Sequence, residues 1–332
     1  MGHDVTLFAS GDSMTTAKLV PGCRESLRLS PESVDHLAHH LVQMEHVLLH
    51  KNEFDVMHFH IDYLHYPFSR RERYIHVTTL HGRLDIPDLV PLYDVYNDVP
   101  VISISDSQRD PLPHLNWQGT VRHGMPVDSY KFHRKPGSYL AFLGRTSPEK
   151  GLDRAIEIAK AAEIPLKIAA KIDKADQEYF ESIVQPLLNN ADIEFVGEIG
   201  YPEKNDFLGN ACALLFPIAW PEPFGIVMIE AMACGTPVIA YPFGSVPEVV
   251  KDGVSGYVVS DQASAVAAVK EIGKIDRKKV RQHFENNFTA DRMALDYLKI
   301  YERMVSRKKA PITASSGVLN WMKLPSPSSS TT

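Results

Sequence analysis

The sequence contains, at residues 221–237, the stretch Pro221-Glu222-Pro223-Phe224-Gly225-Ile226-Val227-Met228-Ile229-Glu230-Ala231-Met232-Ala233-Cys234-Gly235-Thr236-Pro237. Its first glutamate lies in a proline-flanked turn, and its second lies inside a very apolar run that predicts a helix over 224–233. Burying a carboxylate in such a helix is costly unless the carboxylate has a partner. The stretch therefore predicts that Glu222 and Glu230 each hold a polar group.

Short apolar runs alternate with longer helical patterns on both sides of this stretch. In the first half, strands are predicted at 5–10, 55–59, 75–80, 99–103 and 120–122, and a helix from an N-cap at Ser30, with Pro31 at its first position, to about Lys51. In the second half, strands are predicted at 139–143, 166–169, 193–196, 213–216, 237–240 and 257–259, and helices at 153–162, 175–189, 203–209, 224–233, 263–272, 277–286 and 290–306. This order favours parallel sheets covered by helices on both faces. We therefore expect an α/β chain of two Rossmann-like, doubly wound domains that face a cleft, with ligands beyond the carboxyl ends of the strands.

A polar, breaker-rich segment, His133-Arg134-Lys135-Pro136-Gly137, separates the two halves. It predicts a first domain over 1–134 and a second over 135–289, with the helix 290–306 packing back on the first domain. Residues 307–332 are expected to form a tail. From Ala310 to Thr332 this tail is rich in Ser, Thr and Pro and has no acidic residue, which is typical of disorder.

The composition narrows the class of protein. The chain has 332 residues, 44% of them hydrophobic, and a formal net charge of −6, so no global basic field argues for a nucleic-acid partner. No apolar run is long enough for a membrane span, and the first residues show no signal-peptide pattern. The three cysteines are widely spaced and show no zinc-type spacing. A cytoplasmic enzyme is the simplest interpretation, and peripheral contact with a membrane stays open.

Two turns carry groups that suit a phosphate. The segment Gly144-Arg145-Thr146-Ser147-Pro148-Glu149-Lys150-Gly151 follows a predicted strand and opens a helix, so its backbone N–H groups and the two cations Arg145 and Lys150 can neutralise a diphosphate. The turn 221–225 precedes the apolar helix in the same way. Phe224, Gly225 and Ile226 can therefore offer N–H groups to phosphate or sugar oxygens.

These two segments together resemble the donor-site signature of the family 4 retaining glycosyltransferases, which includes a Gly-Arg-x-x-x-x-Lys-Gly motif and the paired glutamates. The resemblance runs from about Gly2 to Tyr301 and is strongest from Gly144 to Val259. It implies the GT-B fold. It also implies that Arg145 and Lys150, with Gly144, hold the donor diphosphate, that Glu222 contacts sugar hydroxyls, and that Glu230 contacts ribose hydroxyls.

The resemblance also covers loops whose sequences are less specific for the family. The loop Gly197-Glu198-Ile199-Gly200 stands where the family touches the nucleobase, so Glu198 becomes a donor-site candidate. In Thr78-Thr79-Leu80-His81-Gly82, the histidine follows a predicted strand, and the family places it near the reacting sugar. Ser103 to Arg109 resembles a Ser-x-Ser-x-x-x-Arg segment on the acceptor side, and the loop at His123 is expected to be structural.

Two further histidines, His58 and His60, alternate to one face of a predicted strand end. A pair of this kind hints at metal, but no third ligand has a recognisable spacing, so acceptor contact or packing is the preferred interpretation. The chain also has no Asp-x-Asp pair for a divalent cation, and we expect no essential metal and no cofactor. No Walker-type and no Gly-x-Gly-x-x-Gly motif is present, which argues against an NTPase or a dehydrogenase.

Residues 2–7 resemble the turn into the second strand of the family's first domain, so the first domain is expected to be N-terminally truncated, without its first strand and glycine-rich loop. The implied reaction is transfer of a sugar from a nucleotide-diphosphate sugar to an acceptor hydroxyl of a glycan, lipid or small molecule, with retention of configuration. Two alternatives stay open. One is an inactive or sugar-nucleotide-binding remnant, and the other is a GT-B nucleotide-sugar epimerase, which the full 221–237 segment disfavours.

Overall fold

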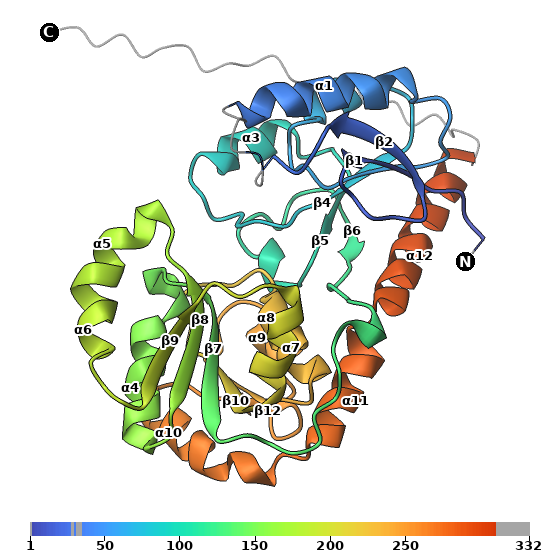
Figure 1. Cartoon of the computed structure of the whole chain (residues 1–332). Helices are drawn as coiled ribbons and strands as arrows, with labels where there is room; N and C mark the ends of the chain where they lie inside the picture. Colours follow the sequence, from blue (N-terminus) through green and yellow to red (C-terminus); the bar gives the residue numbers. More distant parts are fainter. Residues whose placement is uncertain (1, 28–29, 31–34, 310–332) are drawn as a thin grey trace, which may run out of the picture.

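The structure is a computed structural model that describes residues 2–27, 30 and 35–309 (Figure 1). Its strands form a two-stranded sheet β1-β2, a four-stranded sheet β3-β4-β5-β6 and a six-stranded sheet β12-β11-β10-β7-β8-β9. Every pairing between these strands is parallel. Parallel neighbours need crossover connections, which the intervening helices and loops supply. The expected α/β fold with parallel sheets is thus confirmed, although the strands of the first half form two sheets and not one.

The first half of the chain holds the two smaller sheets. Its elements are β1 (Thr6–Ser10), β2 (Lys18–Cys23), α1 (His36–Leu49), β3 (Met57–Phe59), α2 (Tyr66–Ser69), β4 (His76–Thr79), α3 (Leu89–Val95), β5 (Val101–Ser103) and β6 (Trp117–Thr120). The strand β2 was not predicted, because Pro21 and Gly22 weaken the strand pattern of its sequence. It pairs with β1 alone, with Thr6 opposite Lys18.

The start of α1 differs from the prediction. Asp35 is its N-cap, and the Asp35 carboxylate accepts a hydrogen bond of 3.2 Å from the backbone N–H of Ala38. Ser30 lies outside the helix, and the predicted first position, Pro31, lies outside the described residues. Asp35 caps the helix because its side chain reaches an N–H of the first turn that would otherwise be unpaired.

The second half of the chain is built around the six-stranded sheet. Its elements are β7 (Tyr139–Arg145), α4 (Leu152–Ala162), β8 (Leu166–Lys171), α5 (Gln177–Tyr179), α6 (Gln185–Leu187), β9 (Ile193–Gly197), α7 (Tyr201–Gly209), β10 (Ala211–Phe216), α8 (Ile226–Ala233), β11 (Val238–Ala240), α9 (Val246–Val249), β12 (Gly256–Val258), α10 (Gln262–Glu271) and α11 (Arg277–Asn287).

The single helix predicted over 175–189 is wrong in its middle. Between α5 and α6 the backbone forms a π-helical segment, Phe180–Val184, in which Gln185 N–H donates to the carbonyl of Phe180. Pro186 has no N–H and cannot close the next α-helical bond. The wider turn accommodates this missing donor.

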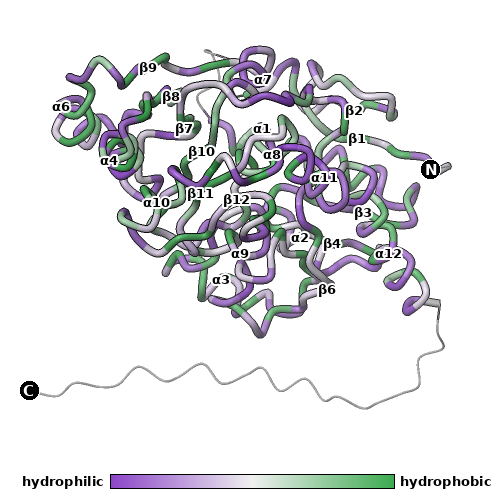
Figure 2. Tube along the Cα trace, turned by 90° about the horizontal axis from the view of Figure 1, so that it is seen from below, coloured by the Kyte–Doolittle hydropathy of each residue, from purple (hydrophilic) through white to green (hydrophobic). Residues whose placement is uncertain are grey.

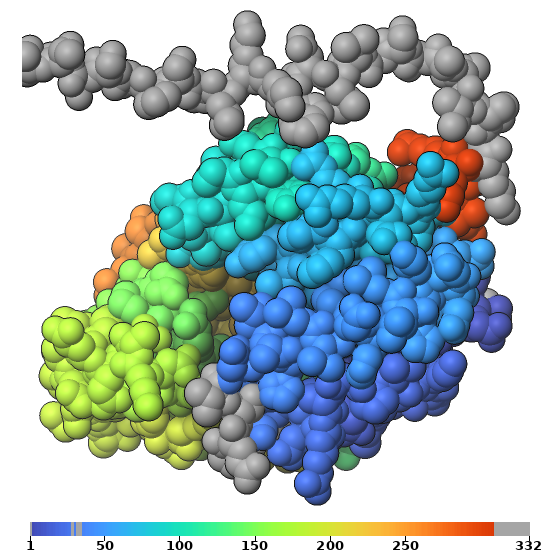
Figure 3. Space-filling view, turned by 90° about the horizontal axis from the view of Figure 1, so that it is seen from above, coloured from blue at the N-terminus to red at the C-terminus, as the bar shows by residue number. Residues whose placement is uncertain are grey.

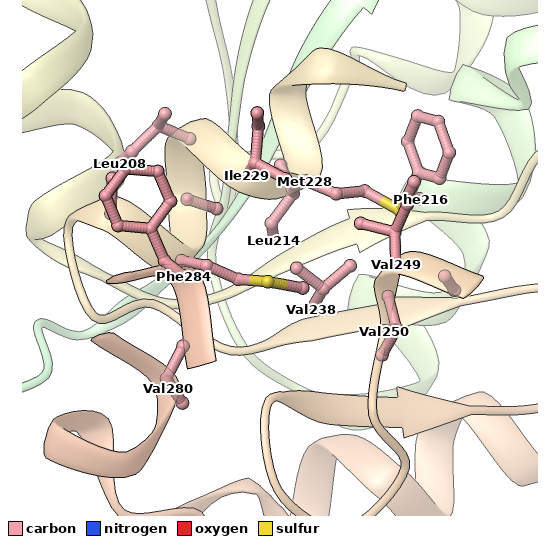
Figure 4. Packing of buried hydrophobic residues seen from close by; sticks show 14 of the residues in the cluster. Leu208, Leu214, Phe216, Met228, Ile229, Val238, Val249, Val250, Val280 and Phe284 are labelled. Carbon is pink, nitrogen blue, oxygen red and sulfur yellow. The ribbon is translucent and has the colours of Figure 1, made fainter. Parts of the chain in front are cut away.

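Buried side chains cover both faces of the six-stranded sheet. Neighbouring β7 residues alternate between them: Ala141 belongs to the cluster under α8 and α11, and Leu140 and Phe142 to the cluster under α4 and α10. Figure 4 shows the first cluster, where Met228 and Ile229 of α8 lie near Leu214 of β10 and Val238 of β11. A sheet buried on both faces explains why its strands read as continuous apolar runs.

The long helix α12 (Ala290–Lys309) leaves the second half and runs along the first (Figure 1). Its Ile300 packs against Val77, Ile102 and Val121. In Figure 2 many helices show both green and purple stretches, as expected for elements with one buried and one exposed face. In the described part of the chain, no helix combines the length and the hydropathy that a bilayer crossing requires. The tail was predicted over 307–332, but α12 continues through residues 307–309, and residues 310–332 lie outside the described residues.

Candidate active site

A cavity of about 330 Å³ lies between the two halves, beyond the carboxyl ends of their strands. Figure 3 shows the hollow between the first half, in blue, and the green part of the second half. Residues from the first half and from three segments of the second half line it: His81, Ile104, His123, Leu143, Gly144, Arg145, Lys150, Phe216, Glu222, Pro223, Phe224, Gly225, Ile226 and Val227. The predicted residues His81, Gly144, Arg145, Lys150, Glu222, Phe224, Gly225 and Ile226 are therefore brought together. Glu198 and Glu230 are not among the lining residues.

The turn after β7 fixes the position of Lys150. The turn ends at Gly151, whose φ of 73° is left-handed, and a Cβ there would lie 2.2 Å from the carbonyl oxygen of Pro217. Only glycine avoids both problems. The backbone N–H of Ala219 also donates to the carbonyl of Glu149 at 2.9 Å. The turn is thus locked against the loop that leads to Glu222.

Lys150 is the partner that the buried carboxylate of Glu222 requires. The Lys150 ammonium donates to Glu222 Oε2, and the two side chains are only 17% and 11% exposed. The same ammonium lies 4.7 Å from the ring centroid of Trp220. The backbone of Glu222 is held as well, because its carbonyl accepts from the N–H of Ser245 at 2.9 Å. This pair is a preformed charged contact on the cavity wall.

Arg145 has a different environment. Its guanidinium is half exposed and lies 3.2 Å from Glu149, and 3.9 Å from both Asp173 and Asp176. Exposed ion pairs of this kind exchange readily for a better acceptor. Arg145 can therefore turn to an anionic ligand without leaving a buried charge behind.

The helix α8 begins at the cavity. Its N-cap, Gly225, has a φ of 74°, and a Cβ at this position would lie 2.8 Å from Met228 Cε. The first N–H groups of a helix have no partner inside the helix, and the helix dipole favours negative charge there. Phe224 and Ile226 flank this helix start and also line the cavity.

Glu230 lies further along α8 than Ile226, and its carboxylate contacts other side chains. Its Oε1 accepts a hydrogen bond of 2.9 Å from the Tyr130 hydroxyl and one of 3.0 Å from the Lys204 ammonium. Burial, and then the negative charge of Glu230, raise the pKa of Tyr130. Glu198 is exposed in the loop after β9. Neither Tyr130 nor Lys204 belongs to a motif near Glu230 in sequence, so no local pattern could have identified them.

Two histidines, His81 and His123, form the opposite wall, and a third, His60, contacts His81 without lining the cavity. His60 Nδ1 and His81 Nε2 are hydrogen-bonded at 2.9 Å, and the rings of His81 and His123 stack at 5.3 Å between centroids. His123 in turn meets Phe224 edge-on at 5.0 Å. Burial lowers the pKa of His81, and lowers that of His123 to about 4, so these imidazoles are neutral near pH 7. His123, expected to be structural, thus also lines the cavity.

Comparison with known proteins finds similarity to glycosyltransferases, strongest in the second half. Residues 130–290 match the model of the family described as Glycosyl transferases group 1. An uncharacterized glycosyltransferase of Methanocaldococcus jannaschii is 26% identical over 172 residues, which cover 49% of this chain and 47% of the relative. The D-inositol 3-phosphate glycosyltransferase of Mycolicibacterium smegmatis is 27% identical over 214 residues, which cover 58% of this chain and 46% of the relative. The chain thus spans about half the length of the curated relatives it matches.

Solved structures extend the similarity over both halves. AviGT4, a glycosyltransferase involved in avilamycin A biosynthesis, has a TM-score of 0.67 at 22% identity and covers 92% of this chain and 86% of its own. Sucrose-phosphate synthase from Thermosynechococcus elongatus has a TM-score of 0.69 at 19% identity, covering 85% and 83%. HepE from Anabaena, in complex with UDP and glucose, has a TM-score of 0.68 at 16% identity, covering 86% of each chain. The chain therefore has the GT-B fold, and its residues 130–290 match the model described as Glycosyl transferases group 1.

Proposed function

We propose that the chain is a family 4 glycosyltransferase, which moves a sugar from a nucleotide-diphosphate sugar to an acceptor hydroxyl with retention of configuration. One observation carries the proposal. The cavity joins Lys150, Glu222 and the start of α8 on one wall to His81 on the other. A diphosphate needs cations and N–H donors, and a sugar needs a carboxylate for its hydroxyls.

In this proposal the donor diphosphate takes the place of Glu222 as the acceptor for Lys150. Arg145 and the N–H groups at the start of α8 stabilise the charge on the leaving oxygen, as preorganised donors do in other enzymes. Glu222, released from Lys150, accepts from two sugar hydroxyls. The support is the Lys150–Glu222 ion pair and the low exposure of its two side chains. We propose that the leaving group is stabilised by these groups, with no essential metal.

The proposed reaction proceeds on one face of the sugar. The diphosphate leaves from the same side on which the acceptor hydroxyl attacks, while the sugar becomes oxocarbenium-like, and positioning of both reactants supplies much of the rate. We propose His81 as the group of the first half that contacts the reacting sugar, and Glu230 as the contact to the ribose. The structural neighbour HepE of Anabaena has been solved in complex with UDP and with UDP-glucose, which supports a uridine nucleotide as the first donor to test. The acceptor class is a glycan, lipid or small molecule with a free hydroxyl.

A screen of nucleotide sugars by thermal shift identifies the donor, because a ligand that binds only the native state raises the apparent stability. With the selected donor, we expect Glu222→Ala to abolish transfer and hydrolysis while leaving the fold intact. Lys150→Ala should raise the donor KM and lower kcat. Lys160→Ala on the outer part of α4 is the matched control, because its ammonium contacts only Glu157 among the described acidic side chains. Wild-type rates in both site variants would overturn the proposal.

A further inference from the structure

His60 does not line the cavity, but its ring contacts the ring of His81, which does line it. We infer that His60 is a positioning residue that holds the His81 imidazole for reaction, through the His60 Nδ1 to His81 Nε2 hydrogen bond of 2.9 Å. The inference rests on the proposed function and deepens it, because it assigns a role to a residue outside the donor site.

The anchor of His60 is built from several contacts. Its ring lies 4.2 Å from the ring of His58, measured between centroids. His58 is itself fixed by hydrogen bonds on both ring nitrogens, to the Tyr301 hydroxyl at 2.6 Å and to Thr79 Oγ1 at 2.8 Å. Tyr301 belongs to α12. Side-chain contacts therefore connect Tyr301 of α12 to His58, His58 to His60, and His60 to His81.

The backbone after His60 supports the same conclusion. Asp62 has a φ of 49°, one of two positive values among the described residues other than glycine. Non-glycine residues in this region are strained and cluster at functional sites. Burial raises the pKa of the Asp62 carboxyl, and an N–H from the backbone of His81 partly offsets this rise. The loop after β3 therefore contacts His81 at two points, its ring and its backbone.

The hydrogen bond also couples the protonation of the two rings. A single proton lies between His60 Nδ1 and His81 Nε2, and both imidazoles are neutral near pH 7, since the surrounding protein lowers the pKa of His81 and lowers that of His60 to about 4. If His81 Nε2 accepts, its Nδ1 carries the proton and donates. If His81 Nε2 donates, its Nδ1 accepts. His60 therefore decides whether Nδ1 of His81 is a donor or an acceptor to a ligand.

A double-mutant cycle tests whether His60 acts through His81. The probe is turnover of UDP-glucose, followed as UDP release with water as the acceptor, by the full chain. We expect His60→Ala to lower kcat by about tenfold to a hundredfold, with the Kd for UDP unchanged within about twofold. In a His81→Ala background, His60→Ala should have no further effect, because the ring that it positions is gone.

Two more variants separate positioning from folding. His60→Asn retains a polar group near the place of Nδ1 and should restore much of kcat, while His114→Ala, an exposed histidine paired with Asp94, is the matched control. Long-range proton–nitrogen NMR should show one tautomer of His81 in the wild-type chain and a mixture in His60→Ala. Additive effects in the cycle, an unchanged tautomer, or a loss of UDP affinity equal to the loss of kcat would each overturn the inference. A wild-type chain that turns over no sugar nucleotide of the screen overturns the proposed function, and the inference with it.

Discussion

Arg277 has a buried guanidinium whose hydrogen bonds go to neutral acceptors. It is 6% exposed, and it donates to the carbonyls of His133, Ala211 and Gly209 and to Thr236 Oγ1, at 2.7 to 2.9 Å. Burial lowers the pKa of this group. These acceptors belong to the segment before β7, the end of α7, the start of β10 and the turn before β11, so one side chain ties these segments together.

We expect Arg277→Met to destabilise the second half by about 3 kcal/mol or more, because buried acceptors lose their donors. Arg277→Lys should rescue little of this loss, since one ammonium cannot reproduce the guanidinium fork. Urea unfolding gives the free energy, with the exposed Lys278→Met as the control. Full rescue by lysine would show that charge, rather than the fork geometry, is what the site requires.

Site residues that belong to a local sequence motif were predictable, but the side chains that contact them from distant parts of the chain were not. Arg145 and Lys150 were predictable because they lie in a turn between a strand and a helix, and Glu222 because its proline-flanked turn precedes an apolar helix. The partner of Glu230, Lys204, comes from another helix, and nothing in its sequence surroundings sets it apart from other surface lysines. Trp220 could not be predicted for the same reason. Its ring centroid lies 4.7 Å from the Lys150 ammonium and 5.4 Å from the Arg83 guanidinium.

At the scale of elements, the strands of the six-stranded sheet were predicted well because their buried faces leave unbroken apolar runs. The strand β2 and the helix α3 carry no such signal. α3 contains Pro91 and buries one described residue, Tyr93. The π-helical segment before α6 depends on one missing N–H, which periodicity cannot reveal.

The helix α12 completes the core of the first half. Ile300 is 4% exposed and packs on β4, β5 and the segment after β6, while Tyr297 and Tyr301 reach Thr79 and His58. We expect Ile300→Ala to cost about 2–5 kcal/mol of unfolding free energy, the usual range for a buried isoleucine. Leu295→Ala is the matched control because Leu295 is half exposed on the same helix. Equal losses from the two substitutions, measured by urea unfolding, would contradict this assignment.

The elements of the first half also carry buried neutral histidines, which predict a loss of stability in acid. Burial lowers the pKa of His65 to about 2 and that of His123 to about 4. The unfolded chain takes up these protons near pH 6.5 and the folded chain does not. The stability is therefore full above pH 6.5 and is lost as the pH falls from 6.5 toward the folded pKa values.

Each such group steepens the pH dependence by up to about 1.4 kcal/mol per pH unit. His123→Gln cannot titrate, so its free energy of unfolding should fall less steeply between pH 6.5 and 5 than that of the wild type. His114→Gln, at an exposed site, should leave the slope unchanged. Parallel slopes for all three proteins would show that His123 is not buried as a neutral group.

At the scale of the whole molecule, two halves facing a cleft were predictable, but the contacts that hold the halves together were not. One of these contacts centres on Glu248 of α9. Its carboxylate accepts from the backbone N–H groups of Asp106 and Ser107, at 3.0 and 2.8 Å, and from Arg122 at 3.0 Å. All three donors belong to the first half. Asp106 and Ser107 lie within Ser103 to Arg109, the segment that resembles the acceptor-side motif.

Charge-assisted hydrogen bonds of this kind are stronger than neutral ones, and the Glu248 side chain is only 16% exposed. We therefore expect Glu248→Ala to loosen the two halves relative to each other. Small-angle X-ray scattering should record a larger radius of gyration, and the KM for the donor should rise because the two cavity walls meet less often. The unfolding free energy should change little, since each half keeps its own core. Glu271→Ala, which removes an exposed pair with Lys274, is the control. A scattering curve identical to that of the wild type would show that α12 alone fixes the arrangement of the two halves.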